Sequence, residues 1–392
     1  MLSFLERASA IVAILLALLV ASVELLPSAG ETYTGGWWTP AATPSILSLT
    51  PQQRLYAGLA AAALGVVALV CAWRREAAAR ALAEQRREEL AFELMATRNN
   101  FMHTDASVAA GRAGSFTPKA TDVFITTYPK CGTTWMTQIC HMLRTNCDMD
   151  FGEITEVVPW DILALDCGQR LDAPQVASPR LFKSHEQWEH IAKGGRYIYV
   201  ARDPLDAFVS FHKFLPAYTG LQPGDISHEQ FAAAIFAGAS KAGGIWGHYL
   251  GWWAQRRAPN VLWVFFEDLR ANLPAEVARV ARFLHLPADE ALLDSVVAMS
   301  SFEFMSDKRN ASHFDDHFVR SHVLPKMGMS ADRPYVSKVR KGGGKVGTRT
   351  EVPASVRKLL DDKWRDTLAG PTGCATYDEL RATIKAESAL SQ

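Results

Sequence analysis

The sequence predicts a three-layer α/β domain with a central parallel sheet, preceded by one or two membrane-spanning helices. Three observations indicate this. Apolar, β-branched runs alternate with segments of helical character in the second part of the chain. One run leads directly into a glycine-containing turn and a helix, an arrangement that binds phosphate. Two long apolar runs precede this part of the chain. Hydrophobic residues make up 48% of the 392 residues, which is enough to form both a domain core and these two runs.

Four short runs are predicted as strands, at residues 123–127, 180–183, 197–201 and 261–266. The longer segments between them, such as 134–143 and 276–284, have helical character. This alternation favours a parallel sheet. Ligands of such sheets bind beyond the carboxyl ends of the strands, and the polar motifs of this chain fall at those ends.

The N-terminal region, residues 1–75, is predicted as a membrane anchor with spans at about 8–26 and 55–73. Each run approaches the roughly 20 residues that a helix needs to cross a bilayer. Glu24 interrupts the first run, for which a cleaved signal peptide is the alternative. The second run carries no charge from end to end.

The charges that flank these runs predict their orientation. Residues 27–53 contain no lysine or arginine, whereas five arginines follow the second run between Arg74 and Arg87. The positive-inside rule therefore places everything after the second run in the cytosol. A single span with a lumenal catalytic domain is the alternative, and a glycan on the sequon at Asn310 would indicate it. Residues 76–120 are predicted as a helical stalk and a linker (104–119), and residues 121–392 as the catalytic domain.

Overall charge and cysteine content exclude some classes of protein. The 41 basic and 41 acidic side chains leave no net field that would attract nucleic acid. The six cysteines form no regular framework, which indicates reduced thiols in a reducing compartment. We therefore expect no nucleic-acid partner.

The most informative segment, residues 123–138, reads VFITTYPKCGTTWMTQ. Gly132 permits a close approach of the backbone to a phosphate, and the helix that follows adds its positive N-terminal end. Lys130, Thr133 and Thr134 supply further donors. The lysine comes before the glycine, which differs from the common GxxxxGK[ST] loop.

Two further motifs follow predicted strands. In the sequence PRLFKSH at 179–185, Lys183 and His185 lie on the same face of a strand end. An unperturbed histidine has a pKa near 6.5 and can remove a proton from a hydroxyl at neutral pH. In YIYVARDP at 197–204, Arg202 precedes a helix that carries Ser210, and its planar fork suits a phosphate dianion.

Together these motifs, from about 123 to 370, resemble those of the cytosolic-type sulfotransferases, which use 3′-phosphoadenosine 5′-phosphosulfate (PAPS). The resemblance implies a P-loop-like fold, His185 as the general base, and Lys130 and Lys183 at the transferring group. It also implies the residues that bind the cofactor: Lys130, Cys131, Gly132, Thr133, Thr134, Trp135, Arg202, Ser210, Ser300, Phe302, Arg340, Lys341 and Gly342.

The chain departs from the family pattern at two side chains of the site. Cys131 stands where the family usually has serine, and Phe266 replaces a tyrosine. The exchange at Cys131 removes a hydroxyl and leaves the backbone cradle intact. A helix N-terminus and a nearby lysine lower a thiol's pKa, and the sequence leaves open whether Cys131 is sensitive to oxidation or alkylation. The sequence after Gly342 also differs from the family's, so the segment that covers the cofactor is expected to close differently.

The sequence thus predicts sulfuryl transfer from PAPS to a hydroxyl or amine. Residues 151–177 are apolar and aromatic, which favours a small hydrophobic acceptor. We expect no metal site, and interpret the cluster from His313 to His317 as a loop near the cofactor. A P-loop phosphotransferase should show GK[ST] and an acidic magnesium ligand, which are not found in order. A membrane-tethered nucleotide-binding scaffold without turnover remains an alternative, and the oligomeric state is not predicted.

Overall fold

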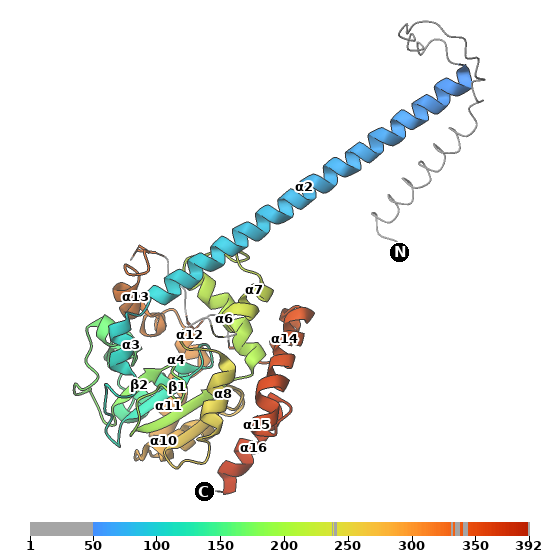
Figure 1. The fold of residues 1–392 in the computed structure, drawn as a ribbon. Helices are drawn as coiled ribbons and strands as arrows, with labels where there is room; N and C mark the ends of the chain where they lie inside the picture. Colours follow the sequence, from blue (N-terminus) through green and yellow to red (C-terminus); the bar gives the residue numbers. More distant parts are fainter. Residues whose placement is uncertain are drawn as a thin grey trace. The chain divides into compact units, whose positions relative to one another are not determined.

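The computed structural model describes residues 50–236, 238, 241–330, 332–333, 338–339 and 344–390 (Figure 1). The chain divides into two units, Met1–Arg87 and Glu88–Gln392. The first predicted span, 8–26, and three predicted cofactor-binding residues, Arg340, Lys341 and Gly342, lie outside the described residues.

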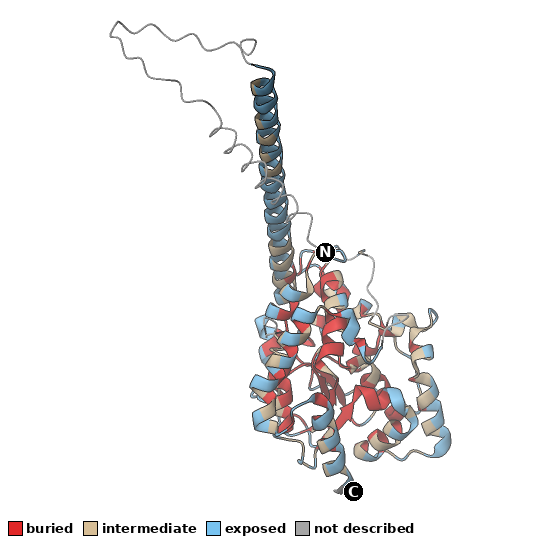
Figure 2. Cartoon of the chain, turned by 90° about the vertical axis from the view of Figure 1, so that its right-hand side faces the viewer, coloured by how far each residue is buried: buried red, intermediate tan, exposed pale blue. Residues whose placement is uncertain are grey.

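The described part of the first unit is helical. Helix α2, Pro51–Phe101, is rich in Ala, Leu, Glu and Arg, which are good helix formers. It includes the second predicted span, 55–73, and the predicted stalk. An 18-residue window of this helix has a mean hydropathy of 2.3 and contains no buried residue, so its length and composition suit a membrane span. Figure 2 shows most residues of its first three-quarters as exposed.

The second unit contains the predicted parallel sheet. Its four strands are β1 Val123–Thr127, β2 Leu181–Ser184, β3 Arg196–Ala201 and β4 Val261–Phe265. They lie in the order β2-β1-β3-β4, and all neighbouring strands are parallel. The prediction of a parallel α/β sheet is confirmed, and each strand begins within one residue of its predicted start.

Two hydrophobic clusters cover the two faces of this sheet, because successive strand residues point to opposite sides. Phe124 and Phe182 belong to one cluster, together with residues of α6 (Pro204–Tyr218), α8 (Ile245–Trp253), α14 (Ala354–Trp364) and α16 (Tyr377–Leu390). Val123 and Ile125 belong to the other, with α4 (Thr133–Thr145), α10 (Leu273–Leu284) and α11 (Glu290–Met299). The three-layer prediction is therefore confirmed (Figures 1 and 2).

The remaining elements are shorter and connect these layers. They are α3 Asp105–Gly111, α5 Ile154–Val157, η2 Leu165–Cys167, α7 His228–Ala234, α9 Phe266–Ala271, α12 Phe302–Ser306, η3 Ala311–Phe314, α13 His317–Val323, η4 Thr348–Glu351, the π-helical turn η5 Arg365–Ala369 and α15 Gly370–Thr372.

The segment 104–119, predicted as a linker, is instead folded against the second unit. Thr104 caps helix α3, and its backbone N and Oγ1 donate to the two carboxylate oxygens of Asp166 at 2.8 and 2.9 Å. Just before it, Met95 and Met102 are buried. These contacts make the end of α2 and all of α3 part of the folded unit.

Candidate active site

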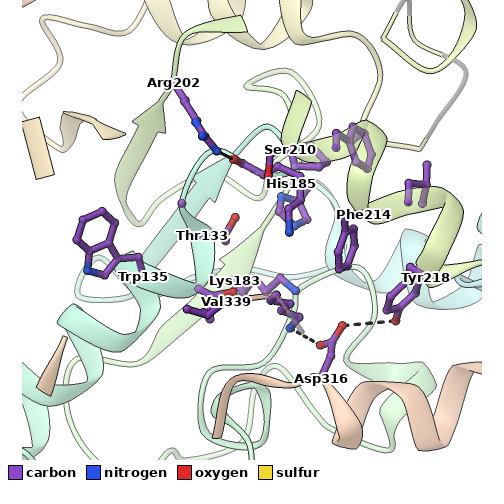
Figure 3. Close-up of a pocket in the computed structure, with 18 of the residues that line it drawn as sticks. Thr133, Trp135, Lys183, His185, Arg202, Ser210, Phe214, Tyr218, Asp316 and Val339 are labelled. Atoms are coloured by element: carbon purple, nitrogen blue, oxygen red, sulfur yellow. Dashed lines mark hydrogen bonds and ion pairs between the residues drawn. The ribbon is translucent and has the colours of Figure 1, made fainter. Parts of the chain in front are cut away.

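A cavity of about 220 Å³ opens where the strands β1 to β3 end. Ten of the predicted site residues line it: Lys130, Gly132, Thr133, Thr134, Trp135, Lys183, His185, Arg202, Ser210 and Phe302. In the view of Figure 3, Trp135 and Arg202 lie away from Phe214 and Tyr218, with Lys183 and His185 between them. One side of the cavity is therefore formed by the turn that follows β1, and another side by helix α6.

The turn after β1 has the backbone conformation that a phosphate cradle needs. Lys130 and Gly132 have positive φ angles of 70° and 106°, and helix α4 begins at Thr133. The φ angle favours glycine, and a Cβ atom on residue 132 would lie 3.0 Å from Cδ2 of Phe266, so this ring would have to shift by a few tenths of an ångström. Because Gly132 has no side chain to cap α4, the first backbone N–H groups of the helix remain available to an anion.

Phe266 packs against three parts of this side of the cavity. Its ring meets the Trp135 ring edge-on at a centroid distance of 5.5 Å, and the Arg202 guanidinium lies 4.2 Å from its centroid. Trp135 Nε1 donates to the backbone oxygen of Ser300 at 2.7 Å. Phe266 thus acts as an aromatic support for Arg202, Trp135 and Gly132.

Arg202 comes from the end of β3 and is 4% exposed. Its Nη1 donates to the Lys130 oxygen and its Nη2 to the Lys345 oxygen, both at 2.8 Å. Nε is buried without a hydrogen-bond partner among the described residues. An unpaired buried donor is costly unless a ligand satisfies it, which suits an anion-binding role.

Two predicted cofactor-binding residues are not among the described residues that line the cavity. Ser300 is fully buried, and Cys131 is 1% exposed within the cluster that contains Tyr128. Burial raises the pKa of the Cys131 thiol to about 12. Desolvation therefore outweighs the nearby cations Arg202 and Lys130, and the burial of Cys131 disfavours its thiolate.

His185 follows β2 and is 9% exposed at the cavity. Its Nδ1 lies 2.9 Å from the backbone oxygen of Thr127. Because a carbonyl oxygen can only accept, Nδ1 carries the hydrogen and Nε2 is the basic nitrogen. Burial, followed by the charge of Lys183, lowers the pKa of His185 well below 6.5, so the ring is neutral at pH 7.

Lys183 is also buried, and its Nζ lies 3.7 Å from the ring centroid of Trp160. Burial, followed by the charge of Lys338, lowers its pKa to about 8. Most of the Lys183 population is therefore charged at pH 7. Lys130, from the turn after β1, has its Nζ 3.8 Å from the Phe214 ring centroid.

A buried group of charges faces Lys183. Lys338 forms ion pairs with Asp316 and, at 3.8 Å, with Glu153. Burial raises the pKa of Glu153 to about 7, whereas Lys338 and Lys183 together overcome the effect of burial on Asp316 and hold its pKa below the usual value. Sequence reasoning placed Asp316 in a loop near the cofactor but did not find this pairing. Among the described residues, no group of three or more His, Cys, Asp or Glu side chains is arranged to hold a metal ion.

The apolar side of the cavity includes a segment that sequence reasoning assigned to the stalk. Asn99, Met102 and His103, at the end of α2, line the cavity together with Phe214 and Tyr218 of α6. One feature of the sequence could have indicated that this segment packs against the domain. Apolar residues that are usually buried, such as Met102, follow the charged stalk. The apolar side of the cavity is thus built partly by residues that precede the predicted domain.

The sequence matches the family model described as "Sulfotransferase domain" over residues 120–326. Among curated proteins, it is 31% identical to Sulfotransferase 1B1 of Canis lupus familiaris over 208 residues, covering 49% of this chain and 68% of that protein. It is 29% identical to Sulfotransferase 1C2 of Oryctolagus cuniculus over 276 residues, covering 66% of this chain and 87% of that protein.

Two solved structures of retinol dehydratase share the fold. One, in complex with androsterone and the inactive cofactor PAP, has a TM-score of 0.52 and 22% identity over 64% of this chain and 82% of its own. The other, in complex with retinol and PAP, has a TM-score of 0.52 and 21% identity over 68% of this chain and 87% of its own. At this level of identity, the likeness concerns the fold.

Proposed function

The chain belongs to the sulfotransferase domain family, and from this premise we propose that it transfers a sulfuryl group from PAPS to a hydroxyl or amine of a small apolar acceptor. The observation that carries the proposal is the position of His185. This neutral imidazole stands at the cavity with Nδ1 bonded to Thr127 and Nε2 left as a base. Charged Lys183 lies close by, and the uncapped start of α4 lines the same cavity.

The residues of the turn fit the cofactor. The N-terminus of α4, Gly132 and Arg202 together form an anion site, in which Arg202 Nε has no partner among the described residues. Trp135 and Phe302 supply aromatic surface for a base. Ser210 on α6 supplies a hydroxyl on the same cavity. PAPS, when bound, supplies the sulfuryl group and leaves as PAP, the molecule found in the retinol dehydratase structures.

Side chains between these two sides of the cavity act on the acceptor and on the transferring group. His185 Nε2 accepts the proton of the acceptor hydroxyl, which increases the nucleophilicity of the oxygen. Lys183 and Lys130 hold positive charge where negative charge develops during transfer. The ring of Trp160 keeps Lys183 at the cavity through a cation–π contact.

The apolar lining supports a small hydrophobic acceptor. Met102, Ile162, Phe211, Phe214 and Leu215 give this side few hydrogen-bonding groups, so a polysaccharide would lose its solvation without replacement. The retinol dehydratase structures hold androsterone and retinol, which are compounds of this type.

We also propose that residues 1–75 anchor the enzyme in a membrane, with residues 76–120 leading to a catalytic domain on the cytosolic side. Helix α2 has the length and hydropathy of a span. Arg74 and Arg75, which follow this apolar segment, support the orientation.

Transfer of sulfur-35 from labelled PAPS to a panel of phenols, sterols, sugars and lipids tests the function. We expect labelled product with phenols or sterols and its loss in His185→Ala, while PAP binding, measured by calorimetry, persists. Binding of PAP without transfer to any acceptor would instead support the scaffold. Magnesium-dependent phosphate transfer from ATP would support a phosphotransferase.

A further inference from the structure

His103 is a polar side chain in the apolar part of the cavity. It lies just after helix α2, lines the cavity and is 9% exposed. Neither of its ring nitrogens has a hydrogen-bond partner among the described residues. Buried polar groups are nearly always paired, so an unpaired imidazole at a cavity indicates a partner that arrives with a ligand.

The surrounding contacts fix where this imidazole lies. Its ring meets the Trp160 ring edge-on at 5.2 Å, and the His185 ring meets the same indole edge-on at 5.0 Å. The centroids of the two imidazoles are therefore no farther apart than these two separations added together. Trp160 contacts both imidazoles, and both line the same cavity, so His103 can meet a part of the acceptor other than the oxygen that reacts at His185.

The neighbouring residues Met102 and Thr104 fix the backbone position of His103. Met102 before it is buried, and Thr104 after it is bonded twice to Asp166. The ring can still make a half-turn about its bond to Cβ, which keeps its plane and exchanges each nitrogen with a carbon. The edge that faces the cavity can therefore present a nitrogen without moving the backbone.

The imidazole is neutral, and this determines what it can bind. Burial lowers the pKa of His103 to about 3, an effect that the carboxylate of Asp166 only partly opposes. A neutral imidazole has one donor and one acceptor nitrogen. It therefore suits a hydroxyl, a carbonyl or an amide and gives no ion pair to a carboxylate.

We infer that His103 is a specificity-determining residue that hydrogen-bonds a second polar group of the acceptor. The inference rests on the proposed function and makes its substrate class narrower. The preferred acceptor is an apolar skeleton with a nucleophilic hydroxyl at one end and a hydroxyl or carbonyl several carbons away. His103 precedes the matched region 120–326, so the family match does not include the residue to which we assign this selectivity.

Paired probes test the inference: para-alkylphenols of two to six chain carbons and their counterparts with a terminal hydroxyl on the chain. Their affinity for the full-length protein is measured by calorimetry in the presence of PAP, so that no transfer is needed. We expect the wild-type protein to prefer the best hydroxylated phenol over its plain counterpart by about tenfold, as one added hydrogen bond to a buried partner implies. His103→Phe should remove this preference and leave the affinity for plain phenols unchanged.

Two further variants complete the design. His103→Gln keeps a donor and an acceptor and should retain most of the preference. His190→Phe is the matched control, because the side chain of His190 is 46% exposed and is not among the described residues that line the cavity.

Equal affinities of the wild-type protein for both probe types, or an equal loss of affinity for both in His103→Phe, would overturn the inference. If His103→Phe does not fold, the wild-type comparison and His103→Gln still decide it. Binding with the expected preference but without sulfuryl transfer would reject the proposed function and keep the role of His103.

Discussion

The Nδ1 atom of His185 lies 2.9 Å from the backbone oxygen of Thr127, which is the last residue of β1. This bond joins the ends of two neighbouring strands and fixes the tautomer of the imidazole. The hydrogen is on Nδ1, so the lone pair is on Nε2 at the cavity. The sheet itself therefore orients the candidate base.

Replacing His185 by alanine should lower kcat by about 10²- to 10⁴-fold, the usual contribution of a general base. PAP binding should not change, since the proposed anion site is formed by the turn and Arg202. Initial rates with sulfur-35 PAPS and calorimetry with PAP measure the two effects, and His190→Ala serves as control. Unchanged turnover in His185→Ala would reject the assigned base.

The pH dependence of kcat/KM follows from two shifted pKa values. His185 must be neutral and so works above its pKa, which lies well below 6.5. Lys183 must be charged and so works below its pKa of about 8. The profile of the free enzyme should be flat from pH 6.5 to near 8, fall on the alkaline side near pH 8, and fall on the acid side only below 6.5.

The variant Lys183→Arg tests whether deprotonation of Lys183 causes the fall of kcat/KM on the alkaline side. Arginine keeps the positive charge and does not titrate in this pH range. In this variant the fall near pH 8 should move to higher pH, whatever the loss of absolute rate. An acid limb centred at or above pH 6.5 would contradict the neutral, buried state of His185.

A glycine can be needed because its φ angle is positive or because a Cβ atom would lack space. Variants of Gly132 and Gly114 distinguish these two effects. Their φ angles are 106° and 97°, but a Cβ on Gly132 would meet Phe266 at 3.0 Å, whereas on Gly114 it would have no described atom within 4 Å. Gly114→Ala should lower the free energy of unfolding by about 1 kcal/mol through conformation alone. Gly132→Ala should lower it further and weaken PAP binding.

Urea unfolding and PAP calorimetry measure these effects. Adding Phe266→Leu to Gly132→Ala should recover part of the stability, since leucine leaves room for the new methyl group. If Gly132→Ala and Gly114→Ala lower the free energy of unfolding equally, the contact of the new methyl group with Phe266 does not contribute to the loss of stability.

The sequence predicted those parts of the site that depend on local structure. Lys130, Gly132 and His185 follow strands, and the ends of parallel strands meet at one edge, so their assembly could be predicted. The surroundings of Cys131 could not, because its neighbour Tyr128 has its ring in a core built by distant helices. The place of His103 was equally hidden, since its contact with Trp160 joins segments that no periodicity connects.

Cys131 should resist alkylation in the folded protein. Burial raises its pKa to about 12, so almost no thiolate exists at pH 8, and its side chain is 1% exposed. The partly exposed Cys147 is the internal reference. After treatment with iodoacetamide, peptide mass spectrometry should find Cys147 modified ahead of Cys131, and both modified in urea. Rapid native modification of Cys131, prevented by PAP, would contradict this account.

The membrane orientation predicts which side of a sealed vesicle a protease must reach. Arg80 in the proposed stalk has a side chain that is 78% exposed, so trypsin should cut near it. In vesicles with the cytosolic face outward, trypsin should release the catalytic domain without detergent, and Asn310 should carry no glycan after expression in a eukaryotic host. A sequon introduced into residues 27–49 is the positive control for glycosylation. Release only after detergent, together with a glycan on Asn310, would place the domain in the lumen and reverse the proposed orientation.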